Sequence, residues 1–284
     1  CTNPLPVMVY IFGGNFKNGS IFKATYDCRY VAYRGEVIVV ALNYRLGPFG
    51  FMYGGDENVP ANLALHDLVL GLKWVQENIA PFGGDPNSVT IFGNSAGSVC
   101  VNALVMCPLA TGLFHRAILQ GGAPNSLMGA ISKSKSLELT KRLASKLNCP
   151  TEPSIQSAVD CLRSKSAEEI VQKLTNDFSK FTDEFFVPIY GDAVFPIAPV
   201  EALKEGKFNR GIDVIFGVTQ NEGSLLVVDM FPKLMAEVAN LTIESTRADI
   251  EYLMNDFPRL GNGQEVAKFY IYNLLENPTD DDLK

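Results

Sequence analysis

The stretch that sets the fold prediction is VTIFGNSAGSVCVNALV, residues 89–105. Val89 to Phe92 form a continuous apolar run, which is typical of a strand buried on both faces. Gly93-Asn94-Ser95-Ala96-Gly97 is a G-x-S-x-G element, and we expect a helix of small residues from there to about Met106. Such a sharp turn lifts a Ser Oγ to the carboxyl edge of a parallel sheet, and its glycines let strand and helix pass without Cβ clashes. We therefore expect Ser95 to be a nucleophile.

Apolar runs and helical patterns alternate along the rest of the chain. Runs that predict further buried strands cover residues 7–12, 37–42, 116–120 and 212–218, and helical spacing of apolar residues covers 62–80 and 134–174. The remainder of the C-terminal part indicates helices joined by loops. This alternation predicts an α/β protein with a mostly parallel sheet and helices on both faces. No internal repeat or linker divides the chain, so we expect one domain over residues 1–284.

Composition limits the class of partner. The 284 residues are 47% apolar and 19% charged, which is a globular composition. The formal net charge of −7 argues against nucleic acid as a partner, because phosphate binding needs a basic face. No uninterrupted apolar run approaches the length of about 18 residues that a membrane span needs, so the sequence predicts no transmembrane segment.

Cysteines and two sequons bear on the compartment. Cys149 and Cys161 flank a stretch rich in Pro and Ser between two helical patterns, a layout that suits a short disulfide-closed loop. Asn18-Gly19-Ser20 and Asn240-Leu241-Thr242 are sequons, so Asn18 and Asn240 are candidate glycosylation sites. Together these features favour a secreted or extracellular protein. Cys100 and Cys107, in contrast, fall in or just after the helix expected behind Ser95, where a free Cys acts as a small apolar side chain.

A second glycine-rich turn lies about 80 residues upstream of Ser95. Gly13-Gly14-Asn15-Phe16 follows the apolar run 7–12. In serine hydrolases with a G-x-S-x-G turn, a loop in this place supplies backbone N–H groups that join the one after the nucleophile to form an oxyanion hole. Here the donors are expected to be Gly14, Asn15 and Ala96. We expect Asn94 and Phe16, which border them, to line the substrate pocket.

Ordered blocks of sequence extend over most of the chain. They are GGNF (13–16), NYRLGPFGF (43–51), KWVQENI (73–79), FGGDP (82–86), the element around Ser95, GLFHRAI (112–118) and GVTQNEGS (217–224). In this order the blocks are similar to those of the type-B carboxylesterase/cholinesterase family, which has the α/β-hydrolase fold. Residues 52–55, MYGG, resemble the arthropod esterases of that family.

The resemblance implies roles for several residues. Ser95 would attack an ester carbonyl, and Glu222, just beyond a strand, would be the acid of a Ser-Glu-His triad. The resemblance also implies the Cys149–Cys161 disulfide. It further implies a buried structural ion pair between Arg45 and Asp67. The implied partner is a small-molecule ester substrate, and the family needs no metal or organic cofactor.

The triad histidine is missing from the chain. The family's histidine follows the acid, whereas His66 and His115 both precede Glu222. We expect His115, inside a structural block, to be structural. We expect His66, in mid-helix beside Asp67, to be an exposed or partly buried helix residue without a catalytic role. The chain therefore resembles a central fragment that lacks the N-terminal part and the C-terminal part with the histidine, and we expect little or no turnover without it.

Other departures bear on the substrate. Position 94 is Asn where the family often has Glu, which removes a negative charge beside the nucleophile and weakens the case for a cationic choline substrate. Position 15 is Asn where a third Gly is usual, and Asn tolerates a positive φ best among non-Gly residues. Residues 182–184 are Thr, Asp and Glu where cholinesterases tend to have aromatics. Trp74, at a helical core spacing, is expected to be packing.

Two alternatives to an ester hydrolase stay open at this point. One is a non-catalytic adhesion or binding protein on the same scaffold, which Asn94 and Asn15 favour mildly and an intact Ser95 and Glu222 disfavour. The other is a lipase-like hydrolase of the His-Gly-Gly-Gly type. Phe12, where that motif has His, and the cysteine loop disfavour it. The acyl group, the alcohol and the oligomeric state do not follow from the sequence.

Overall fold

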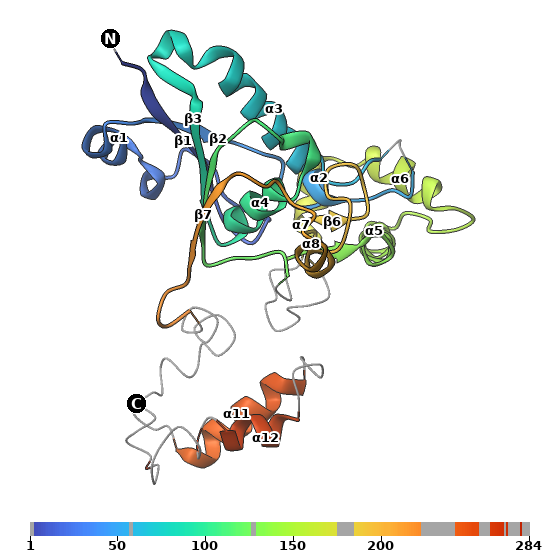
Figure 1. The fold of residues 1–284 in the computed structure, drawn as a ribbon. Helices are drawn as coiled ribbons and strands as arrows, with labels where there is room; N and C mark the ends of the chain where they lie inside the picture. The colour runs from blue at the N-terminus through green and yellow to red at the C-terminus, as the bar shows by residue number, and fades with distance from the viewer. Residues whose placement is uncertain are drawn as a thin grey trace. The chain divides into compact units, whose positions relative to one another are not determined.

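The computed structural model describes residues 3–56, 59–125, 129–174, 185–222, 242–255 and 262–269, together with 271 and 279. The chain divides into two compact units. The first is formed by Cys1–Thr175 and Glu184–Thr219, and the second by Asn176–Asp183 and Gln220–Lys284. The first unit contains the sheet (Figure 1). In the second unit, helix α11 (Ile243–Asn255) packs against α12 (Gly263–Lys268).

A parallel five-stranded sheet is the centre of the first unit, in the order β2-β1-β3-β4-β7. The strands are β1 (Leu5–Ile11), β2 (Ile38–Leu42), β3 (Gly84–Asn94), β4 (Arg116–Gln120) and β7 (Asp213–Gly217). A small parallel pair, β5 (Ile131–Ser132) with β6 (Ile189–Tyr190), lies apart from it. All the strands expected from the sequence are present, and β4 has the predicted bounds.

Helices lie on both sides of this sheet. Helix α1 (Arg29–Gly35) lies on one side, and α3 (Leu63–Asn78) and α4 (Ala96–Val105) lie on the other (Figure 1). The short α2 (Gly47–Phe51) contacts α3. Further along the chain come α5 (Lys133–Lys146), α6 (Ile155–Arg163), α7 (Ala167–Gln172), α8 (Pro199–Glu205) and the 3-10 turns η1 (Ala24–Tyr26), η2 (Ala80–Phe82) and η3 (Pro108–Ala110). In the described residues no helix is long and apolar enough to span a bilayer.

The core lies where the central strands meet α3 and α4. Val9, Ile11, Val89 and Ile91 of the central strands are fully buried. Nine of the ten residues of α4 are buried, and they include Cys100. Cys107, just past the helix, is buried as well, so both cysteines are the small apolar side chains that the sequence predicted. Burial of this kind contributes about 25 cal/mol for each Å² of apolar surface removed from water.

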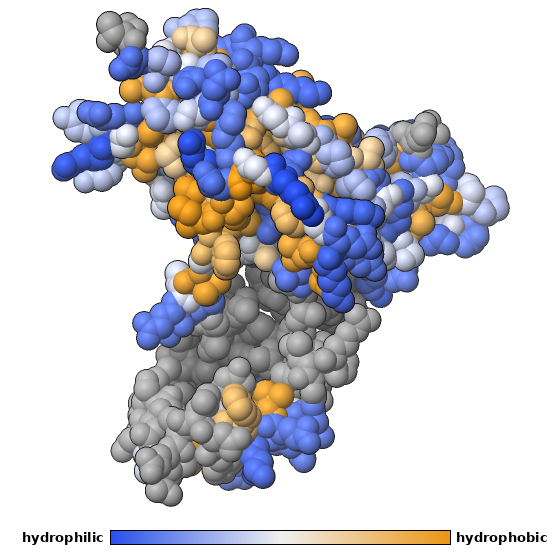
Figure 2. All heavy atoms as spheres, in the orientation of Figure 1, coloured by the Kyte–Doolittle hydropathy of each residue, from blue (hydrophilic) through white to orange (hydrophobic). Residues whose placement is uncertain are grey.

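Two strands predicted to be buried are exposed or half-exposed. All of β7 is exposed, with Ile215 66% and Phe216 81% accessible, because it pairs with β4 alone at the edge of the described sheet. β2, at the other edge, is half-buried throughout. Figure 2 shows apolar atoms gathered on the surface around β7. An apolar run indicates a strand, but it does not tell whether both faces of that strand are covered.

Trp74 was predicted from its helical core spacing to be a packing residue, and it packs at the surface and not in the core. The side chain is 44% accessible, and its ring lies 6.0 Å from that of Phe82, which is also exposed. Leu70, one turn earlier on α3, is 68% accessible. The apolar residues of α3 therefore extend beyond the stripe that contacts the sheet, which is why spacing alone placed Trp74 inside.

The Arg45–Asp67 pair is present, but it is not buried. The guanidinium donates to Asp67 from Nε at 2.8 Å and from Nη2 at 2.6 Å, and its side chain is 45% accessible. These contacts raise the pKa of Arg45, chiefly through the side-chain hydrogen bond to Asp67. The pair joins the loop after β2 to α3, and a half-exposed bidentate pair contributes about 1 kcal/mol or less.

The predicted disulfide is present between Cys149 and Cys161. The segment that the disulfide closes was expected to be a loop between two helices. Part of it is helical instead, because Cys161 lies inside α6. Ser154 caps that helix by accepting a hydrogen bond from the Ser157 N–H, so helix begins within the Ser-rich stretch.

Asn62 ties two distant segments together in the first unit. It is fully buried at the N-terminus of α3, with a φ of 60°. Its Oδ1 accepts from the Ile189 N–H at 2.8 Å, and its Nδ2 donates to the Ile189 carbonyl at 2.6 Å and to Asp192 Oδ2 at 2.9 Å. One carboxamide therefore fixes β6 against α3 across 127 positions of sequence.

We expect Asn62→Ala to lower the free energy of unfolding by about 3 kcal/mol, because it leaves the N–H and carbonyl of Ile189 buried and unpaired. Urea denaturation followed by circular dichroism would measure the change. Asn148→Ala is the matched control: Asn148 has a similar φ of 56° but is exposed. Equal losses in the two variants would show that only backbone conformation matters at position 62.

Candidate active site

Ser95 stands in a strained turn between β3 and α4. Its φ is 54° and its ψ is −124°, a combination that costs a non-Gly residue of order 1–3 kcal/mol. Its N–H donates to the Gln120 carbonyl at the end of β4, at 2.8 Å. The neighbouring strand therefore fixes the backbone of Ser95 in this conformation. The half-buried residue lies at the carboxyl ends of the central strands.

Three glycines let separate backbone segments touch behind Ser95. A Cβ on Gly97 would overlap the Ile11 carbonyl of β1, and one on Gly93 would lie 2.6 Å from the same oxygen. A Cβ on Gly13 would overlap the Asn94 carbonyl and lie 3.1 Å from the Cβ of Ser95. Carbon atoms do not approach backbone this closely, so these three positions require glycine.

The loop that follows β1 turns with positive φ at three successive residues. These are Gly14 at 135°, Asn15 at 53° and Phe16 at 57°. The Gly14 carbonyl accepts from the N–H groups of Lys17 and Asn18, each at 3.0 Å. Asn15 takes the left-handed conformation that Asn tolerates better than other non-Gly residues.

The start of this loop is held by Tyr44. Its hydroxyl donates to the Phe12 carbonyl at 2.6 Å, and the two rings stack at 4.6 Å. Burial raises the pKa of Tyr44 well above its ordinary value, so the hydroxyl keeps its proton and remains a donor.

Backbone N–H groups lie unpaired beside Ser95. In the part of the chain that the structure describes, the N–H groups of Gly14, Asn15 and Ala96 donate to no protein acceptor. Ala96 is the first residue of α4, so the positive end of the helix dipole lies next to Ser95. Unpaired donors of this kind can stabilise a negative oxygen.

A cavity of about 80 Å³ opens at Ser95. It is lined by Asn15, Phe16, Ser95, Ala96, Val99, Gly121, Gly122, Phe185 and Val187. None of these side chains carries a charge. The walls are apolar apart from Ser95, Asn15 and the backbone, so the cavity suits a small uncharged group.

Sequence reasoning missed several residues of this cavity. Val99 follows Ser95 by four positions on α4, so helical spacing could have placed it there. Gly122 is held by the fully buried Ser98, whose Oγ donates to the Gly122 carbonyl at 2.7 Å. Phe185 and Val187 come from far along the chain, and no local signal connects them with Ser95.

The structure places the remaining candidates as follows. Phe16 lines the cavity, whereas the side chain of Asn94 donates from Nδ2 to the Gln120 carbonyl at 3.2 Å. Asn18 is exposed, just after the loop, and Asn240 lies outside the described residues, as do residues 182–184. Glu222 lies in an exposed turn of the second unit, whereas the cavity belongs entirely to the first.

Neither histidine lines the cavity. The Nδ1 of His115 accepts from the Val89 N–H at 3.2 Å, and the backbone N–H of His115 donates to the Val89 carbonyl at 2.8 Å. These two hydrogen bonds join the residue just before β4 to β3, and they confirm the structural role predicted for His115. His66 is exposed on α3.

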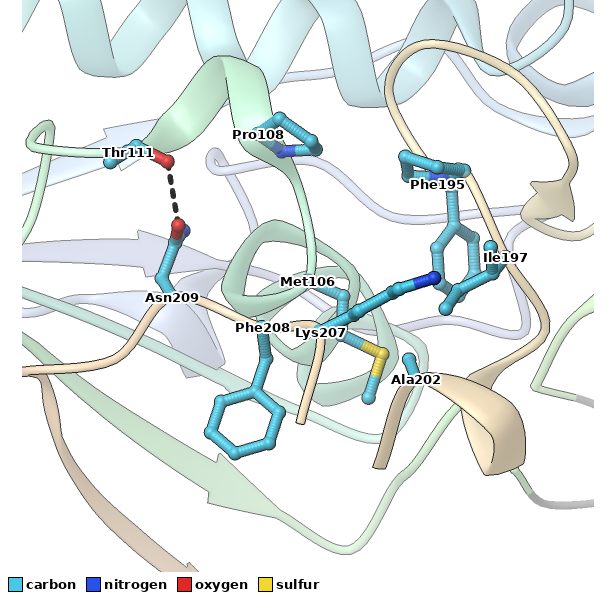
Figure 3. Close-up of a pocket in the computed structure, with 10 residues that line it drawn as sticks. Met106, Pro108, Thr111, Phe195, Ile197, Ala202, Lys207, Phe208 and Asn209 are labelled. Carbon is cyan, nitrogen blue, oxygen red and sulfur yellow. Dashed lines mark hydrogen bonds between the residues drawn. The ribbon is translucent and has the colours of Figure 1, made fainter. Parts of the chain in front are cut away.

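A larger cavity, of about 310 Å³, lies away from Ser95 (Figure 3). Its walls include Met106, Phe195 and Phe208, and Asn209 closes one end by accepting a hydrogen bond from Thr111 at 2.6 Å. The only charged side chain in its walls, Lys207, is paired with Glu205 at 2.7 Å. No residue is common to both cavities.

Comparison with known proteins decides the family. The sequence profile described as "Carboxylesterase family" matches residues 1–283. The chain belongs to the carboxylesterase family. Its sheet and its strand-turn-helix at Ser95 agree with the α/β-hydrolase fold of this family.

Curated relatives include both cholinesterases and carboxylesterases. The chain is 39% identical to an acetylcholinesterase of Danio rerio over 79% of its own length and 36% of the relative's. It is 34% identical to acetylcholinesterase-1 of Trittame loki over 97% and 50% of the two lengths. It is 40% identical to carboxylesterase 5A of Canis lupus familiaris over 81% and 39%. The chain therefore spans half or less of the length of these relatives.

In the longest form of the protein that contains this chain, we expect Gly13→Ala to lower the rate at which a fluorophosphonate probe labels Ser95 by at least about ten-fold, because the added Cβ must displace the Ser95 turn. Intact-protein mass spectrometry after timed exposure would give the rate. Gly217→Ala is the control, since a Cβ there meets nothing within 4 Å. Equal labelling of the Gly13→Ala and Gly217→Ala variants would contradict the required close approach.

Proposed function

We propose that this chain is part of a carboxylic ester hydrolase in which Ser95 is the nucleophile. The observation that carries the proposal is the arrangement at Ser95 itself. A strained Ser at the carboxyl edge of a parallel sheet lies beside unpaired backbone donors and an uncharged cavity. Membership in the carboxylesterase family supports the same chemistry.

Acylation would begin with attack of the Ser95 Oγ on the carbonyl carbon of the ester. A histidine, expected beyond the residues of this chain, would take the Oγ proton as the carbon–oxygen bond forms. The N–H groups of Gly14, Asn15 and Ala96 would stabilise the resulting oxyanion. Collapse of this intermediate breaks the bond to the alcohol oxygen, which leaves with the proton that the histidine returns.

Deacylation would repeat these steps with water in place of the Ser95 hydroxyl. Water attacks the acyl-enzyme, the histidine takes its proton, and the carboxylic acid leaves as Ser95 regains its hydrogen. In the proposal, Glu222 orients this histidine and stabilises its protonated form. The role of Glu222 rests on its place just beyond β7 and on the family resemblance.

We also propose that the protein is secreted and that residues 1–284 form part of a single type-B domain. The Cys149–Cys161 disulfide supports an oxidising compartment, because cytosolic thiols are kept reduced. Asn18, which is exposed, is the proposed glycosylation site within the described residues.

The test uses the longest form of the protein that contains this chain. After treatment with a fluorophosphonate, peptide mass spectrometry should find one adduct, on Ser95, and none in Ser95→Ala. A folded protein without an adduct would contradict the esterase proposal and favour the non-catalytic binding protein.

Glu222→Gln should lower kcat for ester hydrolysis by about 10³- to 10⁴-fold, because the histidine loses its orienting charge. Hydrolysis of p-nitrophenyl acetate would measure it. Glu201→Gln, which changes an exposed carboxylate on α8, is the control. A loss under ten-fold would mean that another residue is the triad acid.

A further inference from the structure

The carbonyl group of Phe12 lies where the loop after β1 meets the helix that follows Ser95. A Cβ on Gly97, the second residue of α4, would lie 2.8 Å from both the carbon and the oxygen of this group. In the part of the chain that the structure describes, the Phe12 oxygen accepts one hydrogen bond, from the Tyr44 hydroxyl at 2.6 Å. One side chain therefore holds the Phe12 peptide group against the backbone of α4.

The other end of the same loop is held by α2. Gly47, the first residue of this helix, donates its N–H to the Phe16 carbonyl at 2.6 Å. The ring of Phe51, the last residue of the helix, is fully buried and meets the Phe16 ring edge to face, with the ring centres 5.3 Å apart. Helix α2 therefore holds the end of the loop, as Tyr44 holds its start.

Both unpaired donors of the loop lie between these two fixed carbonyl groups. The N–H groups of Gly14 and Asn15 come after Phe12 and before Phe16, where the backbone has positive φ. A non-Gly residue keeps such a conformation only where its surroundings hold it. Loss of the hydrogen bond at one end would let the loop relax, and the two donors would move relative to Ser95.

The segment that holds the loop is itself attached to α3. The backbone N–H of Arg45 donates to Asp67 Oδ2 at 3.1 Å, and its Nε donates to the same oxygen at 2.8 Å. The preceding residue, Tyr44, is only 7% accessible, and its ring stacks on that of Phe12 at 4.6 Å. The hydroxyl is therefore held in place before any substrate binds, which is what preorganised donors require of the groups that support them.

We propose that Tyr44 is a positioning residue for ester hydrolysis: by holding the Phe12 carbonyl, it sets the N–H groups of Gly14 and Asn15 where they can stabilise an oxyanion at Ser95. The inference rests on the proposed function, because it takes Ser95 as the nucleophile and these N–H groups as the donors. Tyr44 does not line the cavity at Ser95. Its effect is therefore on the transition state, through the loop, and not on binding of the ester.

The experiment compares Tyr44→Phe with the unmodified sequence, in the longest form that contains this chain and with p-nitrophenyl acetate as substrate. Tyr44→Phe removes only the hydroxyl and keeps the ring that stacks on Phe12. We expect kcat to fall about ten- to hundred-fold, because a displacement of about 1 Å in a catalytic group can cost about 10²-fold. KM should change by less than about three-fold, since the donors act on charge that develops only in the transition state.

A trifluoromethyl ketone inhibitor measures the donors directly. The Ser95 oxygen bonds to the ketone carbon, the hydroxyl proton passes to the expected histidine, and the ketone oxygen becomes an oxyanion. The inhibition constant should therefore rise in Tyr44→Phe by about the same factor by which kcat/KM falls. A residue that only stabilised the fold would change the folded fraction, which circular dichroism measures, without this parallel change in kcat/KM and the inhibition constant.

Tyr53→Phe is the matched control. The Tyr53 hydroxyl also donates to a backbone carbonyl, that of Gly55, at 2.9 Å, and Tyr53 does not line the cavity at Ser95. This variant should keep kcat and the inhibition constant within about two-fold of the unmodified protein.

Phe51→Leu tests the other end of the loop. It removes the edge-to-face contact with the Phe16 ring and leaves the Tyr44 hydroxyl in place. We expect kcat/KM to fall about two- to ten-fold, with a parallel rise of the inhibition constant. This variant makes the same comparison if Tyr44→Phe does not fold.

The outcomes separate this inference from the proposed function. Hydrolysis of no ester by the unmodified protein, with no adduct on Ser95, would overturn the proposed function and the inference with it. Hydrolysis by the unmodified protein and a folded Tyr44→Phe with unchanged kcat would overturn the inference alone. So would a loss of activity in Tyr44→Phe that appears only in KM, or equal losses in Tyr44→Phe and Tyr53→Phe. If only Phe51→Leu can be compared, an unchanged kcat/KM and inhibition constant would overturn the inference.

Discussion

The close approach of three backbone segments behind Ser95 is the constraint on which the site depends. The end of β1, the turn after β3 and the start of α4 meet with no space for a Cβ at Gly13, Gly93 and Gly97. Because protein interiors are close-packed, one added methyl at these points cannot be absorbed locally. This contact sets the position of Ser95 relative to the Gly14 and Asn15 N–H groups, and the register of β1 with β3 holds it in place.

Hydrogen bonds from neighbouring backbone and side chains hold Ser95 in its strained backbone conformation. The N–H of Ser95 and the Nδ2 of Asn94 both donate to the Gln120 carbonyl, so β4 holds the turn from one side. Ser98 fixes Gly122, where a Cβ would overlap the Ser95 carbonyl. Groups held this way need little reorganisation when charge develops on a substrate oxygen, which is the physical basis of oxyanion stabilisation.

Local sequence predicted the features that short-range sterics dictate. The glycine turns, the strands and the Cys149–Cys161 disulfide follow from patterns within a few residues. The exposure of each side chain could not be predicted from local sequence, because it depends on which other segments cover that surface. The apolar run of β7 and the helical spacing of Trp74 both predicted burial, and both are exposed. The cavity wall at Phe185 could not be predicted either, since it is brought to Ser95 by contacts such as that of Asn62 with Ile189.

The described cavity has no charged wall, and this limits how it can recognise a substrate. An uncharged group in this cavity would be stabilised by apolar burial and by hydrogen bonds from the backbone donors, and neither interaction needs a charged side chain. Asn94, where the family often has Glu, adds no charge next to the nucleophile and is itself bonded to the backbone. Attraction of a cation would therefore have to come from residues outside this cavity, because the residues that line it carry no negative charge.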